Sequence, residues 1–410
     1  MINNKNFVRV AVFAACMAGQ FAFSGSDAKE APPPKPGAKI IDEITGLPSA
    51  LYSAALNSSA NLIYLTGYNW NAGMGHLLVM DGWTHKVINQ INSPTLNASL
   101  FVDEDTNTVW AVSNNGGSPN GTAIQFSGLT LKVLKTVPLN GVNVNVVALN
   151  RKTGKYYVTN YSNGEIEVYD KQFNHLTTVP DDNSSYLAIN EKTNKIYVTN
   201  YWDGTVSVID GSTDTIIGNP IQVGVAITPN DCYKTSPWPY PDCTNYDSFS
   251  ALDGIAVDAT TDRIFVVGPN DGTLATIDGN TNKVISTLHL QEGLAFAATM
   301  PELKLALALN WDRSTLSILD EKTEQVTDTV QVGTPDSPNC LRIQWDGGSC
   351  SFWGDVASGV TVSADNKKIY VVTAGDGSGN SPVTDPYAAS KLIILTPTQD
   401  NSLAPRADNQ

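Results

Sequence analysis

Short runs of β-branched and aromatic residues, separated by turns rich in Gly, Asn and Asp, fill the chain from about residue 50 to residue 395. One unit shows the pattern well, with expected strands at Tyr186–Ile189, Lys195–Asn200 and Thr205–Asp210 and a fourth beginning at Thr215–Ile217. Such runs between turn residues are typical of β-strands. The amphipathic stretches of roughly 10–15 residues that a helical repeat requires are not found. The hydrophobic pattern therefore predicts an all-β fold.

The strand pattern repeats along the chain. Lys155-Tyr156-Tyr157-Val158-Thr159-Asn160-Tyr161 and Lys195-Ile196-Tyr197-Val198-Thr199-Asn200-Tyr201 match at an offset of 40 residues. Looser copies of the second strand begin at Leu62, Val109, Arg263, Lys304 and Lys368, which brings the total to seven. Four short strands in about 40 residues is the period of a β-propeller blade. The sequence predicts a seven-bladed β-propeller with four-stranded blades over residues 39–398.

The last copy lacks a fourth strand. Its expected strands are Val360–Val362, Lys368–Thr373 and Lys391–Leu395, after which the chain becomes a polar tail at residues 399–410. The segment Lys39–Ile44 is an unpaired strand ahead of the first copy. Pairing it with the last copy would join the chain ends and remove an exposed sheet edge. We therefore expect a composite last blade that closes the ring.

Copies three and four carry the most regular motif. Tyr157-Val158-Thr159-Asn160 and Tyr197-Val198-Thr199-Asn200, each followed by Gly and a strand ending in Asp, resemble the YVTN family of β-propeller repeats. The resemblance covers roughly residues 50–395 and implies export and a seven-bladed propeller. It spans surface-layer proteins, periplasmic binding proteins and propeller domains of redox enzymes, so it implies no single chemistry. Copy two departs most, with Gln125-Phe126-Ser127-Gly128 where other copies end in Asp.

The first residues are typical of a secretory leader. Lys5 and Arg9 precede an apolar stretch, and Ala22-Phe23-Ser24 offers a small-x-small cleavage site, so residues 1–24 are predicted to be a signal peptide. Residues 25–38 form a Pro-rich linker. We expect an exported protein, periplasmic or extracellular, without a membrane span. The residues before Cys16 partly resemble a lipoprotein box, which keeps lipid anchoring as an alternative to simple cleavage.

Four further cysteines fall into two close pairs, Cys232 with Cys243 and Cys340 with Cys350. An even count in an exported chain favours two short-loop disulfides. The alternative, a four-thiolate zinc site, normally uses Cys-x-x-Cys pairs, and neither spacing fits.

The excess of acidic residues makes one class of partner, nucleic acid, unexpected. With 25 Lys+Arg against 40 Asp+Glu, the formal net charge is −15, and no cluster of Lys and Arg is visible. Phosphate binding requires a cationic surface, so nucleic acid, including the single-stranded DNA bound by some YVTN relatives, is not expected as a partner.

Repeated acidic residues are predicted to be structural. Asp81, Asp210, Asp278 and Asp320 each end a third strand and precede a Thr by three residues. A side chain at such a position can accept the free backbone N–H groups of a tight turn. Asn150 and Asn190 are expected to do the same after the first strand.

Function is expected at one end of the ring. The loops between second and third strands share that end with the connections between blades, which include insertions near residues 222–253 and 332–358. These segments combine aromatic planes with carboxylates, which suit a cationic, carbohydrate or peptide ligand. The candidate ligand-binding residues are Tyr161, Trp202, Asp203, Trp238, Tyr240, Asp271, Trp311, Asp312, Trp345 and Trp353.

Catalytic signatures are scarce. Of the histidines, His85 and His175 map to turns on the opposite end, and no haem-attachment motif or nucleophile elbow is present. We therefore predict a non-enzymatic scaffold without a cofactor or metal, which binds an envelope protein, a carbohydrate or a small cationic ligand. The alternative is a metal-dependent propeller hydrolase or lactonase using acidic residues near the channel, such as Asp203, Asp271 and Asp312.

Overall fold

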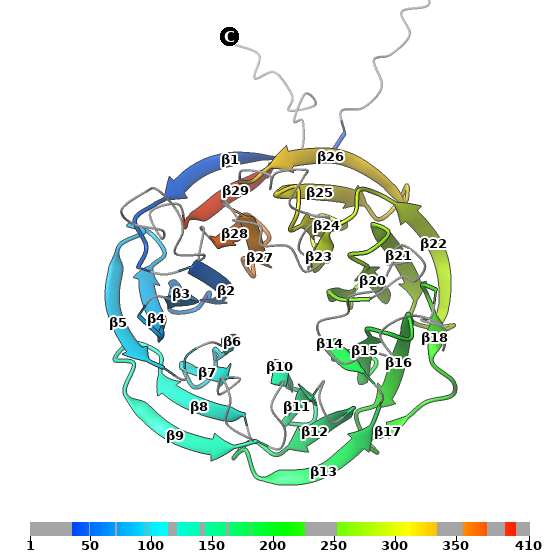
Figure 1. Cartoon of the computed structure of the whole chain (residues 1–410). Coiled ribbons are helices and arrows are strands. Elements are labelled where there is room, and N and C mark those ends of the chain that lie inside the picture. Colours follow the sequence, from blue (N-terminus) through cyan, green and yellow to red (C-terminus); the bar gives the residue numbers. More distant parts are fainter. Residues whose placement is uncertain are drawn as a thin grey trace, which may run out of the picture. The chain divides into compact units, whose positions relative to one another are not determined.

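Seven antiparallel sheets arranged in a ring form the part of the chain that the structure describes (Figure 1). The structure is a computed structural model, and it describes residues 35–48, 50–69, 72–94, 96, 98–113, 121–139, 144–160, 164–181, 183–225, 252–333, 356–374 and 390–398. Every regular element within these ranges is a strand. The predicted seven-bladed β-propeller is confirmed.

In blades 1, 2, 3, 5 and 6 the strands pair in chain order from the ring axis outward, whereas blades 4 and 7 differ in their outer strand. Blades 1 to 3 consist of β2 (Ala50–Asn57), β3 (Leu62–Asn69), β4 (Met74–Asp81) and β5 (Val87–Ser93); β6 (Ala98–Asp103), β7 (Thr108–Ser113), β8 (Thr122–Ser127) and β9 (Val133–Pro138); and β10 (Val144–Asn150), β11 (Lys155–Asn160), β12 (Glu165–Tyr169) and β13 (His175–Pro180). Blades 4 and 5 consist of β14 (Ser184–Asn190), β15 (Lys195–Asn200), β16 (Thr205–Asp210), β17 (Thr215–Ile216) and β18 (Ile221–Gln222); and β19 (Ile255–Asp258), β20 (Arg263–Val267), β21 (Thr273–Asp278) and β22 (Lys283–His289). Blades 6 and 7 consist of β23 (Leu294–Met300), β24 (Leu305–Asn310), β25 (Thr315–Asp320) and β26 (Gln325–Gln331); and β27 (Val356–Val362), β28 (Ile369–Ala374), β29 (Leu392–Thr398) and β1 (Gly37–Ile44).

The ring is closed by the first described strand. β1 runs antiparallel to β29, from Gly37 opposite Thr398 to Ile44 opposite Leu392, with a bulge between Ile40 and Asp42. First strands of neighbouring blades contact each other around the whole ring, including β27 with β2. The composite last blade expected from the sequence is confirmed.

Blade 4 differs from the prediction in its fourth strand. The expected strand at 215–217 is divided into β17 and β18, which both pair with β16. Gly218, with φ of 68°, and Pro220 lie between the two pieces. A left-handed residue and a proline without an N–H interrupt the ladder, so the outer edge of this blade is broken.

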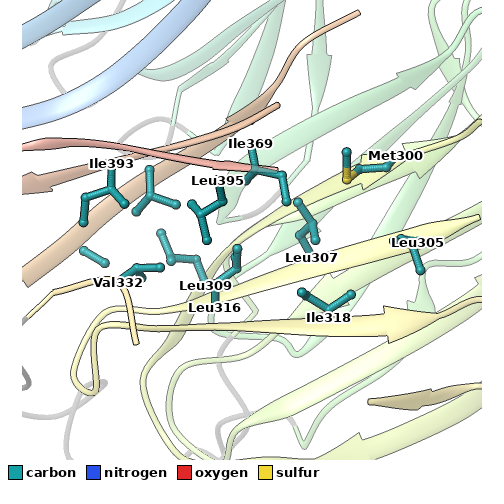
Figure 2. Packing of buried hydrophobic residues seen from close by; sticks show 12 residues of the cluster. Met300, Leu305, Leu307, Leu309, Leu316, Ile318, Val332, Ile369, Ile393 and Leu395 are labelled. Atoms are coloured by element: carbon teal, nitrogen blue, oxygen red, sulfur yellow. The ribbon is translucent and has the colours of Figure 1, made fainter. Parts of the chain in front are cut away.

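The hydrophobic core is divided among the seven blade interfaces. Each buried cluster takes side chains from two neighbouring blades, including the pair formed by blades 7 and 1. Figure 2 shows the cluster between blades 6 and 7, where Leu307 and Leu309 of β24 meet Ile369 of β28 and Leu395 of β29. One sheet cannot bury its faces alone, so each blade depends on both neighbours.

The repeated Tyr and Thr residues connect each blade to the next one. Thr159 Oγ1 of blade 3 donates to the Ser185 carbonyl of blade 4 at 2.8 Å, and Thr199 Oγ1 of blade 4 donates to the Asp253 carbonyl of blade 5 at 2.8 Å. Tyr157 is fully buried, and its hydroxyl lies 2.7 Å from Asp214 Oδ1 in blade 4. The motif is therefore structural, because it satisfies buried polar groups across blade interfaces.

The predicted turn role of the repeated Asp residues is confirmed. Asp81 Oδ1 accepts hydrogen bonds from the backbone N–H of Trp83 at 3.0 Å and of Thr84 at 2.7 Å. Asp210, Asp278 and Asp320 accept equivalent backbone bonds in their own turns. Asn150 and Asn190 do so after the first strands of blades 3 and 4.

Replacing Thr199 by valine should reduce the free energy of unfolding by about 2 kcal/mol, because buried backbone groups lose their partners. The Thr199 hydroxyl accepts from the Tyr186 N–H at 3.0 Å and donates to the Asp253 carbonyl. Urea titration measures the change. The exposed Thr213, exchanged for valine, is the matched control and should change stability by less than about 0.5 kcal/mol. Equal stability of the two variants would contradict this role of Thr199.

Candidate ligand-binding face

Hairpins between second and third strands lie at one end of the ring, together with the connections between blades, because strands alternate in direction. We call this end the loop face and define it by the hairpins 201–204, 268–272 and 311–314 of blades 4, 5 and 6. The hairpins are bonded to the blade connections: Tyr201 N–H donates to the Asn183 carbonyl at 3.0 Å, and Trp311 N–H donates to the Gly293 carbonyl at 2.8 Å.

Five of the residues predicted for binding lie in these three hairpins. Trp202 and Asp203 belong to blade 4, Asp271 to blade 5, and Trp311 and Asp312 to blade 6. The structure thus places all five on the loop face, on three consecutive blades.

The other predicted site residues fall outside the described residues. They are Tyr161, Trp238, Tyr240, Trp345 and Trp353, together with Cys232, Cys243, Cys340 and Cys350. The predicted disulfides fall outside them for the same reason.

Three half-buried aromatic rings form a row that reaches from the inner strands to the loop face. Tyr186 on β14 meets Phe296 on β23 edge to face, with ring centroids 6.3 Å apart and planes at 83°. Phe296 lies parallel to Trp311, with centroids 6.5 Å apart and planes at 17°. We call Tyr186, Phe296 and Trp311 the aromatic row. Tyr186 and Phe296 thus belong to β14 and β23, which are inner strands of the ring (Figure 1).

Blade 5 leaves room for this contact. Tyr186 and Phe296 belong to blades 4 and 6, and Gly254 precedes the inner strand of the blade between them. A Cβ atom on Gly254 would lie 2.6 Å from the Ala295 carbonyl oxygen and 2.7 Å from Phe296 Cα. Glycine is therefore required for the close approach of blades 5 and 6.

A carboxyl group lies beside the aromatic row. Asp253 Oδ1 accepts a hydrogen bond from Ser185 Oγ at 3.3 Å. Burial raises the pKa of Asp253 to about 7, although the Ser185 bond lowers it slightly. Burial also raises the pKa of Tyr186, and the charge of Asp253 contributes to that shift. Asp253 is therefore close enough to the row to act on its electrostatics, and it ionises near neutral pH.

Hydrogen bonds between the Asn310 side chain and backbone groups hold the hairpin that carries Trp311. Asn310 Nδ2 donates to the carbonyls of Gln291 at 3.0 Å and Glu292 at 2.8 Å, while its Oδ1 accepts from the Arg313 N–H at 2.8 Å. Trp311 is thus presented from a fixed backbone, as in a preformed binding site.

The chain was compared with protein-family models and with curated proteins, and neither comparison found a match.

The described part of the chain gives two further findings. It holds no three His, Cys, Asp or Glu side chains placed to share a metal ion. Nor does it contain a helix with the length and apolar character needed to cross a membrane. His85 and His175 lie at hairpins of the opposite face, as the sequence predicts.

Sequence reasoning found Trp311 but missed its neighbours. The missed residues lie in or next to inner strands, where the sequence does not distinguish them from ordinary strand residues. They are Tyr186, Phe296 and Asp253. Aligning the seven first strands offers one signal, because two aromatic residues flank a glycine at the same position in three successive copies. That signal becomes meaningful only once the blade register is known.

Proposed function

We propose that this protein is an exported, non-enzymatic scaffold that binds a small organic cation on its loop face, at the aromatic row beside Asp253. The observation that carries the proposal is the row itself, three partly exposed rings from blades 4 and 6 beside one titratable carboxyl. Aromatic faces attract cations, and methylated ammonium groups use this mode because they have no N–H to donate.

Charge supports a cation rather than an anion. The chain carries a formal net charge of −15, and Asp203, Asp271 and Asp312 lie on the same face as the aromatic row. Summed negative charge raises the local concentration of cationic ligands. The propeller architecture supports a binding scaffold in general, because loops on a rigid ring are held in fixed positions. The likeness of copies three and four to YVTN repeats supports the proposed export.

The experiment uses tetramethylammonium as the probe and calorimetry as the readout. Trp311→Ala should weaken binding by about two- to thirtyfold, because a cation–π contact in a partly desolvated site contributes about 0.5–2 kcal/mol. The control is Trp83→Ala, which removes a side chain that is 80% exposed on the opposite face. Trp83→Ala should leave the affinity unchanged.

The pH dependence separates a cation from a carbohydrate. Asp253 becomes ionised as the pH rises through about 7, so cation affinity should increase from pH 5 to pH 8. Asp253→Asn should remove this increase. A carbohydrate stacked on the same rings would bind independently of that ionisation. Absence of tetramethylammonium binding, or equal loss in both tryptophan variants, would contradict the proposal.

A further inference from the structure

The position directly after the outer strand holds a buried apolar residue in blades 2 and 6 but an aspartate in blade 3. The residue after each outer strand turns toward the next blade, and its N–H donates to a carbonyl at the start of the third strand: Leu139 to Gly121, Asp181 to Gly164, and Val332 to Ser314, at 2.8–2.9 Å. Leu139 and Val332 are 1% and 0% exposed and belong to the hydrophobic clusters at their blade interfaces.

Asp181 places a carboxyl group where those blades bury an apolar side chain. It is 7% exposed and lies between blades 3 and 4. A buried carboxyl at an otherwise apolar position opposes folding, and such local exceptions to a repeat are expected at functional sites.

A buried hydrogen-bond chain runs from Asp181 into blade 4. Ser207 Oγ donates to Asp181 Oδ1 at 2.6 Å, and Asn200 Nδ2 lies 2.9 Å from Ser207 Oγ and 3.0 Å from Thr205 Oγ1. Because the Ser207 hydroxyl has a single proton, which it gives to Asp181, it can only accept from Asn200. This fixes the orientation of the Asn200 amide.

The series of hydrogen bonds ends at the Asn200 side chain, whose amide oxygen accepts no hydrogen bond within the described residues. Asn200 is 3% exposed. Buried polar atoms in native structures are nearly always paired, so an orphaned acceptor requires an explanation. A ligand that donates a hydrogen bond is one.

Three residues of this hydrogen-bond chain, Asp181, Asn200 and Thr205, line a cleft of about 510 Å³ between blades 3 and 4. Pro180 and Pro220 provide apolar walls, and Asp181, Asn200, Asp203 and Thr205 provide polar atoms. The division of the outer strand into β17 and β18 places Pro220 at this cleft, where the broken edge of blade 4 borders it.

The acidic hairpin at the cleft is held from both sides. Gln222 Nε2 donates to the carbonyls of Asp203 at 3.4 Å and Gly204 at 3.2 Å. Asn183 Nδ2 lies 3.4 Å from Asp203 Oδ2. The Asp203 carboxylate is therefore presented to the cleft from a fixed backbone.

We propose that this cleft binds a guanidinium group, carried by an arginine side chain or by a small guanidine. Two carboxylates and one amide oxygen come from separate chain segments, and the residues lining the cleft include no Lys, Arg or His. A guanidinium offers five N–H donors in one plane, whereas an ammonium offers three, so it can reach several separate acceptors at once. Its flat faces pack against the proline walls.

The test uses the full chain and agmatine as the probe, with calorimetry as the readout. Agmatine should bind at least tenfold more tightly than putrescine, which has the same four-carbon chain and terminal ammonium but carries a second ammonium in place of the guanidinium. Asp181→Leu restores the apolar residue type of the other blades and should abolish agmatine binding in a folded protein. Asp203→Asn should weaken it at least tenfold. The matched control is Glu302→Gln, an exposed acid on the opposite face, which should bind agmatine as the parent does.

Two further arms identify the source of the group and separate this cleft from the aromatic row. An arginine tripeptide that binds at least tenfold more tightly than agmatine identifies a protein partner, and equal affinity identifies a small guanidine. Trp311→Ala should leave agmatine binding unchanged, so failure of one site is distinguishable from failure of the other. Absence of agmatine and tripeptide binding, equal affinity for putrescine, or binding that survives Asp181→Leu would overturn the proposal. So would a calcium ion that binds through Asp181 when agmatine does not.

Discussion

A chain that lacks residues 1–44 should be less stable by about 4 kcal/mol than one that lacks only residues 1–34, and it should self-associate. β1 pairs with β29 along its whole length, so its removal breaks a ladder in which each hydrogen bond contributes roughly 1 kcal/mol. Ala38 and Ile40 also pack on the cluster between blades 6 and 7, and Ile44 packs on the cluster between blades 7 and 1. Deletion therefore weakens both interfaces of one blade.

Self-association is expected because the deletion leaves β29 as an unpaired sheet edge, which can pair with another chain. Urea titration and light scattering measure the two effects. The chain beginning at Lys35 is the matched control, since it keeps β1 and loses only residues before it. If both chains unfold at the same urea concentration and remain monomeric, β1 does not close the ring.

The fold could be predicted in detail because the same strand pattern occurs in seven copies along the sequence. The expected strands Lys195–Asn200 and Thr205–Asp210 agree with β15 and β16 residue by residue. Both strands are nearly continuous apolar runs, because each faces a hydrophobic cluster on either side. The closing strand was predictable because an unpaired edge is unfavourable, so the last copy required a partner.

The site was less predictable because its residues are exceptions to the repeat. Asp181 appears in sequence as a polar residue after a strand, and only the bond from its N–H to Gly164 shows that it is equivalent to Leu139. Asn200 belongs to a motif whose neighbours are structural, so its unused oxygen could be recognised only from the orientation of its amide.

A second exception lies on the opposite face, in the turn after β25. Blades 1, 2, 4 and 5 have a glycine after the last residue of the third strand, whereas blade 6 has Glu321. At Gly279, for example, a Cβ atom would lie 2.3 Å from Asp262 Oδ1. Blade 6 has Lys304 at the position equivalent to Asp262, so this side chain does not exclude Glu321.

Glu321 is expected to make stability depend on pH. Its side chain is 2% exposed, and Thr261 Oγ1 donates to its Oε2 at 3.0 Å. Burial, followed by the charge of the nearby buried Asp258, raises the pKa of Glu321 to about 7. Lys304 Nζ lies 3.5 Å from Asp258 Oδ2, and its charge offsets part of this effect.

The sign follows from the direction of the shift. The folded protein holds the proton of Glu321 up to about pH 7, whereas the unfolded chain releases it near the ordinary glutamate pKa of 4.5. The contribution of Glu321 to the free energy of unfolding is therefore greatest below pH 4.5, falls as the pH rises to about 7, and is constant above it. Asp253, whose pKa is also about 7, adds to the same decrease.

Glu321→Gln should therefore stabilise the protein at pH 8 by about 2 kcal/mol and leave it nearly unchanged at pH 4.5, since the amide resembles the protonated acid. Urea titrations at the two pH values measure the difference, and Glu302→Gln controls for loss of an exposed charge. The expected slope would be wrong if Glu321→Gln destabilised the protein at pH 8. That result would mean that the carboxylate is ionised and stabilised by its neighbours, and that the buried pair with Asp258 holds its charge through Lys304.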